Sequence, residues 1–164
     1  MGISVLPNPG PEVSFLFAGL NYQHAPYIGC AMKLPANETW TGFHPLAGAP
    51  ANPHLDPCLS MWENRLFLLF SLPSNHLGVY WYDFPWYGLR FLKELDFKFA
   101  PISAAFLGRY LWIAQQKSDN TVWLTRLDPG LVPVEYPTNI TAMPKSDPIV
   151  YCFNDQLYLA TCQQ

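Results

Sequence analysis

One short pattern occurs three times in this chain, and it limits what the chain can fold into. Each copy starts with a proline, has an aromatic residue five positions later, and has an arginine or glutamine three positions after that. The copies start at Pro57, Pro101 and Pro148, and the shared positions match without a gap. Chance is a poor explanation of three gapless matches, so we interpret the pattern as an internal structural repeat. The shared aromatic and polar positions are Trp62 and Arg65, Phe106 and Arg109, and Phe153 and Gln156.

Each copy consists of two apolar runs separated by a two-residue turn, which is the signature of a tight β-hairpin. The turns are predicted at Glu63-Asn64, Leu107-Gly108 and Asn154-Asp155. The repeat recurs after 44 residues, from Pro57 to Pro101, and after 47, from Pro101 to Pro148. Such a period is typical of β-propellers, in which each blade is a four-stranded antiparallel sheet. The sequence therefore predicts an all-β chain with about three to three and a half blades and almost no helix.

The predicted blades divide a single domain that covers residues 13–164. They lie at about 13–50, 57–97 and 101–140, with a partial fourth blade at 148–162. Residues 1–12 contain three prolines and two glycines, so we expect an N-terminal arm and not a strand. The first blade would then lack its innermost strand, and a strand that carries Trp40 is expected on its outer side. The last strand of the third blade is predicted near Val132 to Tyr136.

The composition excludes several classes of partner. The chain has 164 residues, of which 50% are hydrophobic and 13% charged, so it can bury a sizeable core. Its nine Lys and Arg residues are scattered and its net charge is -3, whereas nucleic acid binding needs clustered positive charge. The apolar runs are too short to span a bilayer, and no signal-peptide pattern is present at the start. We therefore expect no nucleic acid partner, no membrane association and a cytoplasmic location.

Cysteine spacing and the absence of known motifs argue against a metal or a cofactor. The four cysteines are Cys30, Cys58, Cys152 and Cys162, and none of them forms a Cys-x-x-Cys pair or a zinc-finger spacing. We expect buried thiols; a disulfide between Cys152 and Cys162 is conceivable on the two arms of the last hairpin, but a reducing compartment opposes it. No phosphate-binding loop, nucleophile elbow or nicotinamide fingerprint is present, so no cofactor is expected.

The order of the elements carries a family resemblance. A strand that contains a tryptophan precedes a proline-led strand, which continues into a hairpin with Leu-Tyr-Leu in its second arm; a polar loop and an aromatic strand follow. This order resembles the lectin-like β-propellers of fungi and bacteria, and the resemblance covers most of residues 13 to 164. It implies a propeller fold and carbohydrate binding.

The short length of the chain predicts a partner. Propellers typically have four to eight blades, and a ring of three would leave sheet faces and strand edges exposed. We therefore expect a homodimer in which two chains supply blades to one ring or pack their open ends together. In this hypothesis the hairpin at 148–162 completes the blade that lacks its first strand.

Candidate site residues lie in the loops that a propeller gathers on one face, where ligands bind. Imidazoles and carboxylates in these loops can exchange protons near neutral pH, and aromatic rings beside them can line an apolar pocket. The predicted catalytic residues are His24, His76, Asp56 and Asp147. The predicted substrate-binding residues are Tyr22, His54, Phe84, Trp86, Lys117 and Asp119.

Two functions of different classes fit these residues. The first is binding of a small, largely apolar molecule in one asymmetric pocket, which includes cofactor-free acid/base catalysis in secondary metabolism. Such an enzyme would cyclise its substrate, add water or a hydroxyl to an alkene, or isomerise it. The alternative is a carbohydrate-binding lectin. Because the predicted third strands, which start near Ile28, Gly78 and Thr121, do not repeat the same polar residues, the first function is favoured.

Overall fold

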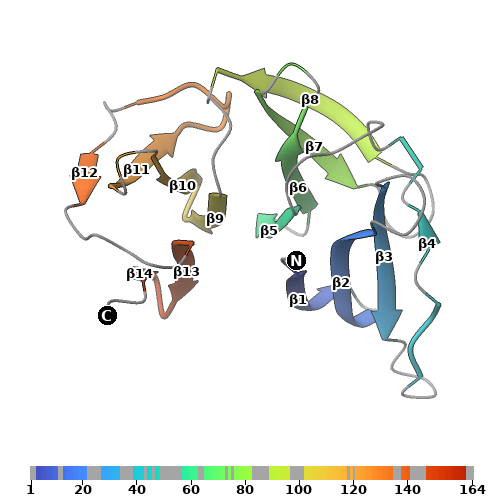
Figure 1. The fold of residues 1–164 in the computed structure, drawn as a ribbon. Coiled ribbons are helices and arrows are strands. Elements are labelled where there is room, and N and C mark those ends of the chain that lie inside the picture. The colour runs from blue at the N-terminus through green and yellow to red at the C-terminus, as the bar shows by residue number, and fades with distance from the viewer. Residues whose placement is uncertain are drawn as a thin grey trace. The chain divides into compact units, whose positions relative to one another are not determined.

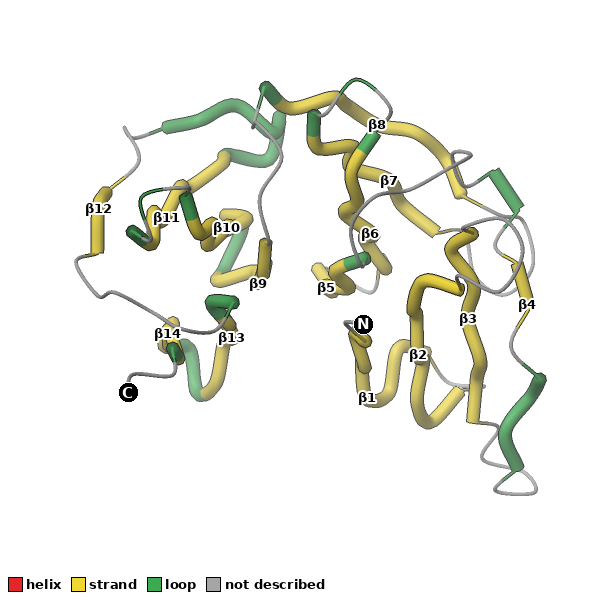
Figure 2. Tube along the Cα trace, in the orientation of Figure 1, coloured by secondary structure: helices red, strands yellow, loops and turns green. Residues whose placement is uncertain are grey.

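A computed structural model describes most of the chain, and every regular element in the described part is a β-strand (Figures 1 and 2). All the strand pairs are antiparallel, so the predicted all-β class is confirmed. The chain divides into two compact units, Met1–Phe99 and Ala100–Gln164, each of which is described by itself. The described residues are 3–10, 13–21, 27–33, 39–42, 44–45, 47–48, 57–62, 65–72, 74, 76–82, 89–96, 102–117, 119, 121–134, 138–140 and 147–161.

The first sheet consists of four consecutive antiparallel strands. These are β1 (Ile3–Gly10), β2 (Val13–Asn21), β3 (Tyr27–Lys33) and β4 (His44–Pro45), and they pair in the order β1-β2-β3-β4. The predicted outer strand with Trp40 is confirmed in part: Trp40 forms an antiparallel bridge with Lys33 of β3, and the regular outer strand β4 starts at His44.

The prediction of an irregular arm over residues 1–12 is wrong, because β1 is a regular strand paired with β2. A proline cannot donate a ladder hydrogen bond, but it is tolerated on an edge strand. β1 is such an edge, and its register shifts between Pro7 and Gly10. The first sheet therefore has four strands, and it does not need the hairpin at 148–162 to complete it.

The second sheet of the first unit follows the predicted repeat closely. Its strands are β5 (Cys58–Trp62), β6 (Arg65–Ser71), β7 (Leu77–Tyr82) and β8 (Leu89–Leu95), paired in chain order. Residues 66–70 of β6 are all buried, so both faces of this strand are covered. A continuous apolar run is what such a strand requires. β1 of the first sheet lies beside β5.

The second unit contains one four-stranded sheet and one hairpin. The sheet consists of β9 (Ile102–Leu107), β10 (Tyr110–Gln116), β11 (Val122–Leu127) and β12 (Thr138–Ile140), paired in chain order. The hairpin consists of β13 (Ile149–Phe153) and β14 (Gln156–Ala160). The fully buried side chains of the sheet include Leu111, Ile113, Val122 and Leu127.

The last strand of this sheet lies later than the predicted Val132 to Tyr136. Asp128 closes a turn there, because its Oδ1 accepts a hydrogen bond from the Val132 amide at 2.9 Å. Val132 and Val134 are exposed, Pro133 forms an isolated bridge with Leu127, and the Val134 amide donates a hydrogen bond to the Arg126 carbonyl at 3.0 Å. The regular strand paired with β11 is Thr138–Ile140, which is β12.

The turn between β9 and β10 lies one residue later than predicted. The two strands pair up to Leu107 and Tyr110, so the turn residues are Gly108 and Arg109. Gly108 has a φ of 57°, which the first position of a type II′ turn requires and which glycine adopts without strain. In the last hairpin, by contrast, the predicted turn Asn154-Asp155 is correct, and both residues have positive φ, as in a type I′ turn.

One face of hairpin β13–β14 packs on β9 and β10. Val150 is buried with Ala105, Ala114 and Val122, and the partly buried Leu157 and Leu159 pack against this cluster. Two hydrogen bonds hold the contact: the Val150 amide donates to Ser103 Oγ at 3.0 Å, and Ser103 Oγ donates to the Val150 carbonyl at 3.3 Å. The hairpin is therefore fixed to the sheet of its own unit.

Candidate functional site

The structure describes four of the ten predicted site residues. His76 lies in the first unit, whereas Lys117, Asp119 and Asp147 lie in the second. The other six predicted site residues, His24, Asp56, Tyr22, His54, Phe84 and Trp86, lie outside the described residues. Their roles stay predictions.

His76 is the centre of a polar group that we call the His76 site, formed by Ser74, His76, Glu94 and Asp96. His76 Nδ1 lies 2.6 Å from Glu94 Oε1, and the same oxygen accepts a hydrogen bond from Ser74 Oγ at 2.9 Å. His76 Nε2 lies 3.5 Å from Asp96 Oδ1. The His76 side chain is 37% exposed and that of Asp96 is 92% exposed, so solutes can reach the site.

The local fold explains why these residues meet. Ser74 and His76 belong to the short connection between β6 and β7, which is closed by a hydrogen bond from the Leu72 amide to the His76 carbonyl at 2.8 Å. Glu94 and Asp96 lie at the end of the antiparallel strand β8, next to the start of β7. The site therefore lies at one end of the β5–β8 sheet.

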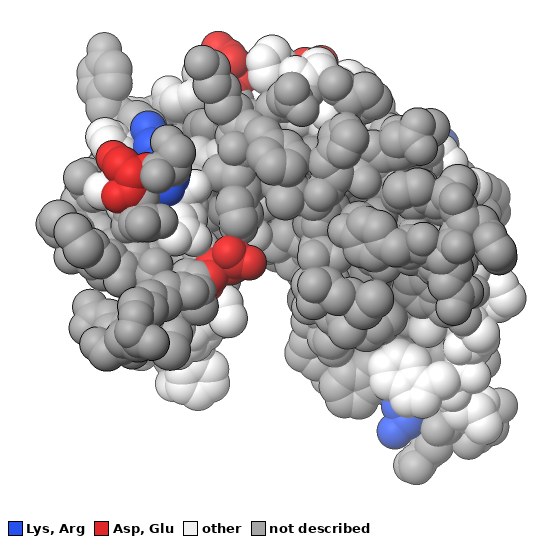
Figure 3. Space-filling model, viewed as in Figure 1, with Lys and Arg blue, Asp and Glu red and all other residues white. Residues whose placement is uncertain are grey.

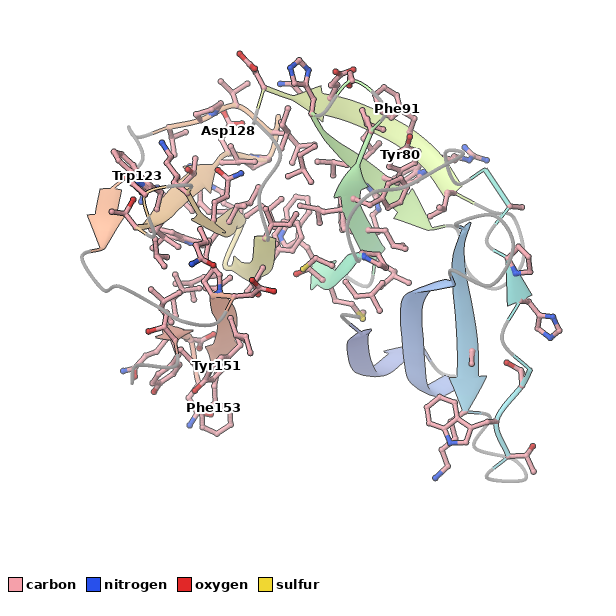
Figure 4. All side chains as sticks on the ribbon, viewed as in Figure 1. Tyr80, Phe91, Trp123, Asp128, Tyr151 and Phe153 are labelled. Atoms are coloured by element: carbon pink, nitrogen blue, oxygen red, sulfur yellow. The ribbon has the colours of Figure 1, made fainter. Side chains whose placement is uncertain are left out.

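A β-bulge in β8 places Glu94 on the same face of the sheet as Phe91. Tyr80 pairs with Phe91 and Val79 pairs with Lys93, so Leu92 is an extra residue in the strand. Without the bulge, Phe91 and Glu94 would point to opposite faces, because side chains alternate along a strand. With it, both residues share the face of Gly78 and Tyr80. Figure 4 shows Tyr80 and Phe91 beside each other on β7 and β8.

Tyr80 forms the apolar floor next to the polar group. Its ring stacks on Phe70 at a centroid distance of 4.4 Å and meets the edge of Phe91 at 5.2 Å. Tyr80 and Phe70 are buried, whereas Phe91 is 54% exposed. A solvent-accessible aromatic surface therefore lies on the same sheet face as Glu94.

The Tyr80 ring packs close to the backbone of Gly78, which has no side chain to obstruct it. A Cβ atom on Gly78 would lie 2.8 Å from Leu72 Cδ2 and 2.8 Å from Tyr80 Cε2, and both side chains are buried. We expect Gly78→Ala to lower the free energy of unfolding by about 1–3 kcal/mol, because overpacking displaces well-packed neighbours. Urea unfolding measures this loss, and a variant as stable as the wild type would contradict the packing described for Tyr80.

The site shifts two pKa values in opposite directions. Hydrogen bonds from Ser74 and then from His76 lower the pKa of Glu94 below its ordinary value of 4.5. Burial, and then the nearby Glu94 charge, raises the pKa of Tyr80 above 10.0. At neutral pH Glu94 is therefore a carboxylate and Tyr80 is a neutral phenol.

We expect Ser74→Ala to raise the pKa of Glu94 towards 4.5, because the hydrogen bond from Ser74 is the largest cause of the shift. A carboxyl pKa lowered by folding adds stability above the pKa of the unfolded state, and this stability is lost as the pH falls through the folded value. NMR titration of the glutamate carboxyl measures the pKa. Asp96→Asn is the control and should leave it unchanged; an unchanged value in Ser74→Ala would contradict the prediction.

In the second unit, Lys117 and Asp119 stabilise the connection between β10 and β11 in which they lie. Asp119 Oδ1 accepts hydrogen bonds from Thr121 N at 3.0 Å and Thr121 Oγ1 at 2.6 Å, which lower the pKa of Asp119. Thr121 Oγ1 in turn accepts from Trp123 Nε1 at 2.7 Å. Lys117 Nζ lies 3.9 Å from the centroid of the Trp123 ring. These contacts give both residues a local structural role, while substrate binding by them stays a prediction.

Asp147 and two of the cysteines are also described. Asp147 is exposed just before β13, and its predicted catalytic role stays a prediction. Cys58 is buried and forms no disulfide, as expected, but the expected burial of Cys152 is wrong, because Cys152 is exposed. It lies at the turn end of a two-stranded sheet, beyond the cluster around Val150.

Several cations of the described strands lie over aromatic rings. Arg65 lies 4.8 Å from the centroid of Trp81, and Arg126 lies 4.8 Å from that of Tyr110. Arg109 Nη2 also donates a hydrogen bond to Tyr110 Oη at 3.1 Å, which raises the pKa of Arg109. In Figure 3 the described Lys and Arg side chains form separate spots and not a continuous patch.

Sequence reasoning missed Glu94, Asp96 and Tyr80. Glu94 is one of several charged residues in β8, and nothing in the sequence distinguishes it from a solvated side chain. Pairing of the predicted third and fourth strands could have indicated that the end of β8 lies next to His76. The bulge at Leu92, which decides the face, has no clear sequence signal.

Comparison of the sequence with models of protein families finds no match, and comparison with curated proteins also finds none. Within the described ranges, no helix is long and apolar enough to span a membrane. The same part of the chain contains no group of three or more His, Cys, Asp and Glu residues placed to hold a metal ion.

Proposed function

We propose that the chain binds a small, largely apolar molecule at the His76 site and acts on it by acid/base catalysis. The observation that carries this proposal is the 2.6 Å contact between His76 Nδ1 and Glu94 Oε1 on an accessible sheet end. A histidine that is oriented by a carboxylate is a common arrangement for a general base.

The proposal assigns proton transfer to one nitrogen of His76, Nε2. An ionised carboxylate can only accept hydrogen bonds, so His76 Nδ1 carries the hydrogen that Glu94 binds. In the neutral ring His76 Nε2 then has a free lone pair and can remove a proton from a ligand. After the ring has taken up a proton, the same nitrogen can return it to the ligand, and Asp96 Oδ1 lies 3.5 Å from this nitrogen.

The ligand surface beside this nitrogen is aromatic. Phe91 exposes about half of its surface, and the buried Tyr80 lies between Phe91 and Phe70. Such rings suit an apolar ligand, and Ser74 Oγ, His76 Nδ1 and Glu94 Oε1 are already engaged with one another. This is why we favour an apolar substrate over a carbohydrate.

We further propose that the sheets are blades of a β-propeller. Three sheets have four strands in consecutive antiparallel order, and a repeated hairpin opens two of them and recurs in β13–β14. The inner face of β13–β14 packs on the neighbouring sheet, as successive blades do. In a propeller the loop between β6 and β7 would open on a face where ligands bind.

A ligand screen by thermal shift tests the proposed function. Apolar small molecules that bind the native chain should raise its melting temperature, since a ligand at 100 times its Kd stabilises by about 2.7 kcal/mol. His76→Gln and Phe91→Ala should each weaken this shift, whereas His44→Gln, at an exposed histidine of β4, should not. Two results would count against the proposal. One is a ligand whose thermal shift is unchanged in the His76→Gln and Phe91→Ala variants, and the other is a shift caused by simple monosaccharides.

A further inference from the structure

The outer face of hairpin β13–β14 is an exposed apolar surface. It consists of Ile149, Tyr151 and Phe153 on β13 and of Gln156, Tyr158 and Ala160 on β14. Ile149 is 58% exposed, Tyr151 47%, Phe153 60% and Tyr158 38%. The hairpin therefore presents four large apolar side chains and no charged one on this face (Figure 4).

This face is ordered by contacts within the hairpin. Tyr151 and Tyr158 are paired across the strands, and their rings stack at 5.3 Å with an interplanar angle of 12°. Tyr158 Oη donates a hydrogen bond to Gln156 Oε1 at 2.8 Å. Because the hydroxyl of Tyr158 already has a partner, this ring can be buried against another surface without leaving that group unsatisfied.

The internal repeat indicates what should cover such a face. In the preceding hairpin, Leu107 and Tyr110 flank the turn, as Phe153 and Gln156 do in the last one. Counting from the turns, Ala105 corresponds to Tyr151 and Ala114 corresponds to Ala160. Ala105 and Ala114 are buried, and Val150 of the next hairpin packs on them.

The first copy of the repeat has the same pattern of burial. Counted from its turn, Ser60 corresponds to Tyr151, Phe67 to Tyr158 and Leu69 to Ala160. These three residues are 5%, 5% and 0% exposed. The compared positions are therefore buried in the first two copies of the repeat and exposed in the third.

We infer that a second copy of this chain covers the outer face of β13–β14 with one of its own sheets. The covering element in the preceding hairpin is another copy of the same repeat, which makes a sheet of this protein the matching occupant. In a propeller each blade packs on the next one, so the exposed face of β13–β14 is a surface on which another blade would fit. This step rests on the propeller proposed above and does not depend on the ligand of the His76 site. Stacked tyrosines and a phenylalanine are also typical of the core of a protein interface.

The mass of the full chain in solution tests the inference. Light scattering at micromolar concentrations should give twice the chain mass of 18.6 kDa. The double variant Tyr151→Ser, Phe153→Ser should give the mass of one chain while keeping its circular dichroism, because both side chains are exposed in the isolated chain. Val132→Ser, Val134→Ser is the matched control, since these residues are also exposed in the second unit, and it should leave the dimer intact.

Three results would overturn the inference. One is a wild-type chain that has the mass of a single chain at all these concentrations. Another is a dimer that persists in the Tyr151→Ser, Phe153→Ser variant, since the contact would then use another surface. The third is a monomer whose melting temperature rises with a simple sugar and loses this response in the double variant, because the stacked tyrosines would then be a sugar platform. A failed ligand screen at His76 would leave all three results unaffected.

Discussion

Replacing Phe70 with alanine is expected to be among the most destabilising changes in the described part of the chain. Phe70 is fully buried in β6 and stacks on Tyr80 at 4.4 Å. Truncating a buried phenylalanine removes apolar contacts and leaves a cavity, which typically costs about 3–5 kcal/mol. Urea unfolding should show this loss, and the variant should also weaken ligand binding because Tyr80 loses its support.

Phe91→Ala is the matched control, because Phe91 also contacts Tyr80 but is 54% exposed. Its truncation removes an edge contact without opening a buried cavity, so the loss should stay below about 1.5 kcal/mol. Equal losses for the two variants would mean that β6 does not lie at the centre of a packed sheet.

Replacing His76 with alanine should lower turnover of a substrate found in the ligand screen by about 100-fold to 10,000-fold. The physical reason is that proton transfer by a positioned imidazole is lost, while the backbone of the β6–β7 connection keeps its hydrogen bond from Leu72. Turnover is measured under substrate saturation, and circular dichroism confirms that the variant is folded.

Two further variants separate chemistry from packing. Glu94→Gln should keep the fold but lower turnover, because a neutral amide oxygen binds the His76 Nδ1 hydrogen more weakly than a carboxylate and orients the ring less firmly. His44→Ala removes an exposed histidine of the first sheet and should leave turnover unchanged. Full activity of His76→Ala would move the proton transfer to another group, such as the predicted His24.

The sequence predicted the hairpins well, because their apolar runs and turn residues are local signals. Strand β5 starts directly after the repeat proline Pro57 and ends directly before the predicted turn Glu63-Asn64, and the predicted turn Asn154-Asp155 was correct. β1 was missed because its prolines argue against a ladder, and a sequence alone does not tell an edge strand from a central one. The turn at Gly108 was displaced because the apolar Leu107 could serve either as turn or as strand.

The candidate site was predicted only in part. His76 was found because a histidine in a connecting loop is a chemical signal by itself. Ser74 and Glu94 become partners of His76 only through the pairing of β7 with β8 and the bulge at Leu92, which are tertiary features. The outer face of β13–β14 could not be predicted, since an alternating apolar strand is the same in sequence whether it is covered or not.

The bulge at Leu92 also determines how insertions and deletions in the gene would affect the site. A one-codon deletion of Leu92 would restore regular pairing of β7 with β8 and keep Glu94 opposite Gly78, because Phe91 and Glu94 would then be two positions apart on one face. A one-codon deletion or insertion that no bulge absorbs would instead shift the register by one residue and turn the Glu94 side chain to the opposite face. The proposed acid/base pair could therefore be separated by a change in strand length alone, and the identities of the residues in the His76 site would not reveal it.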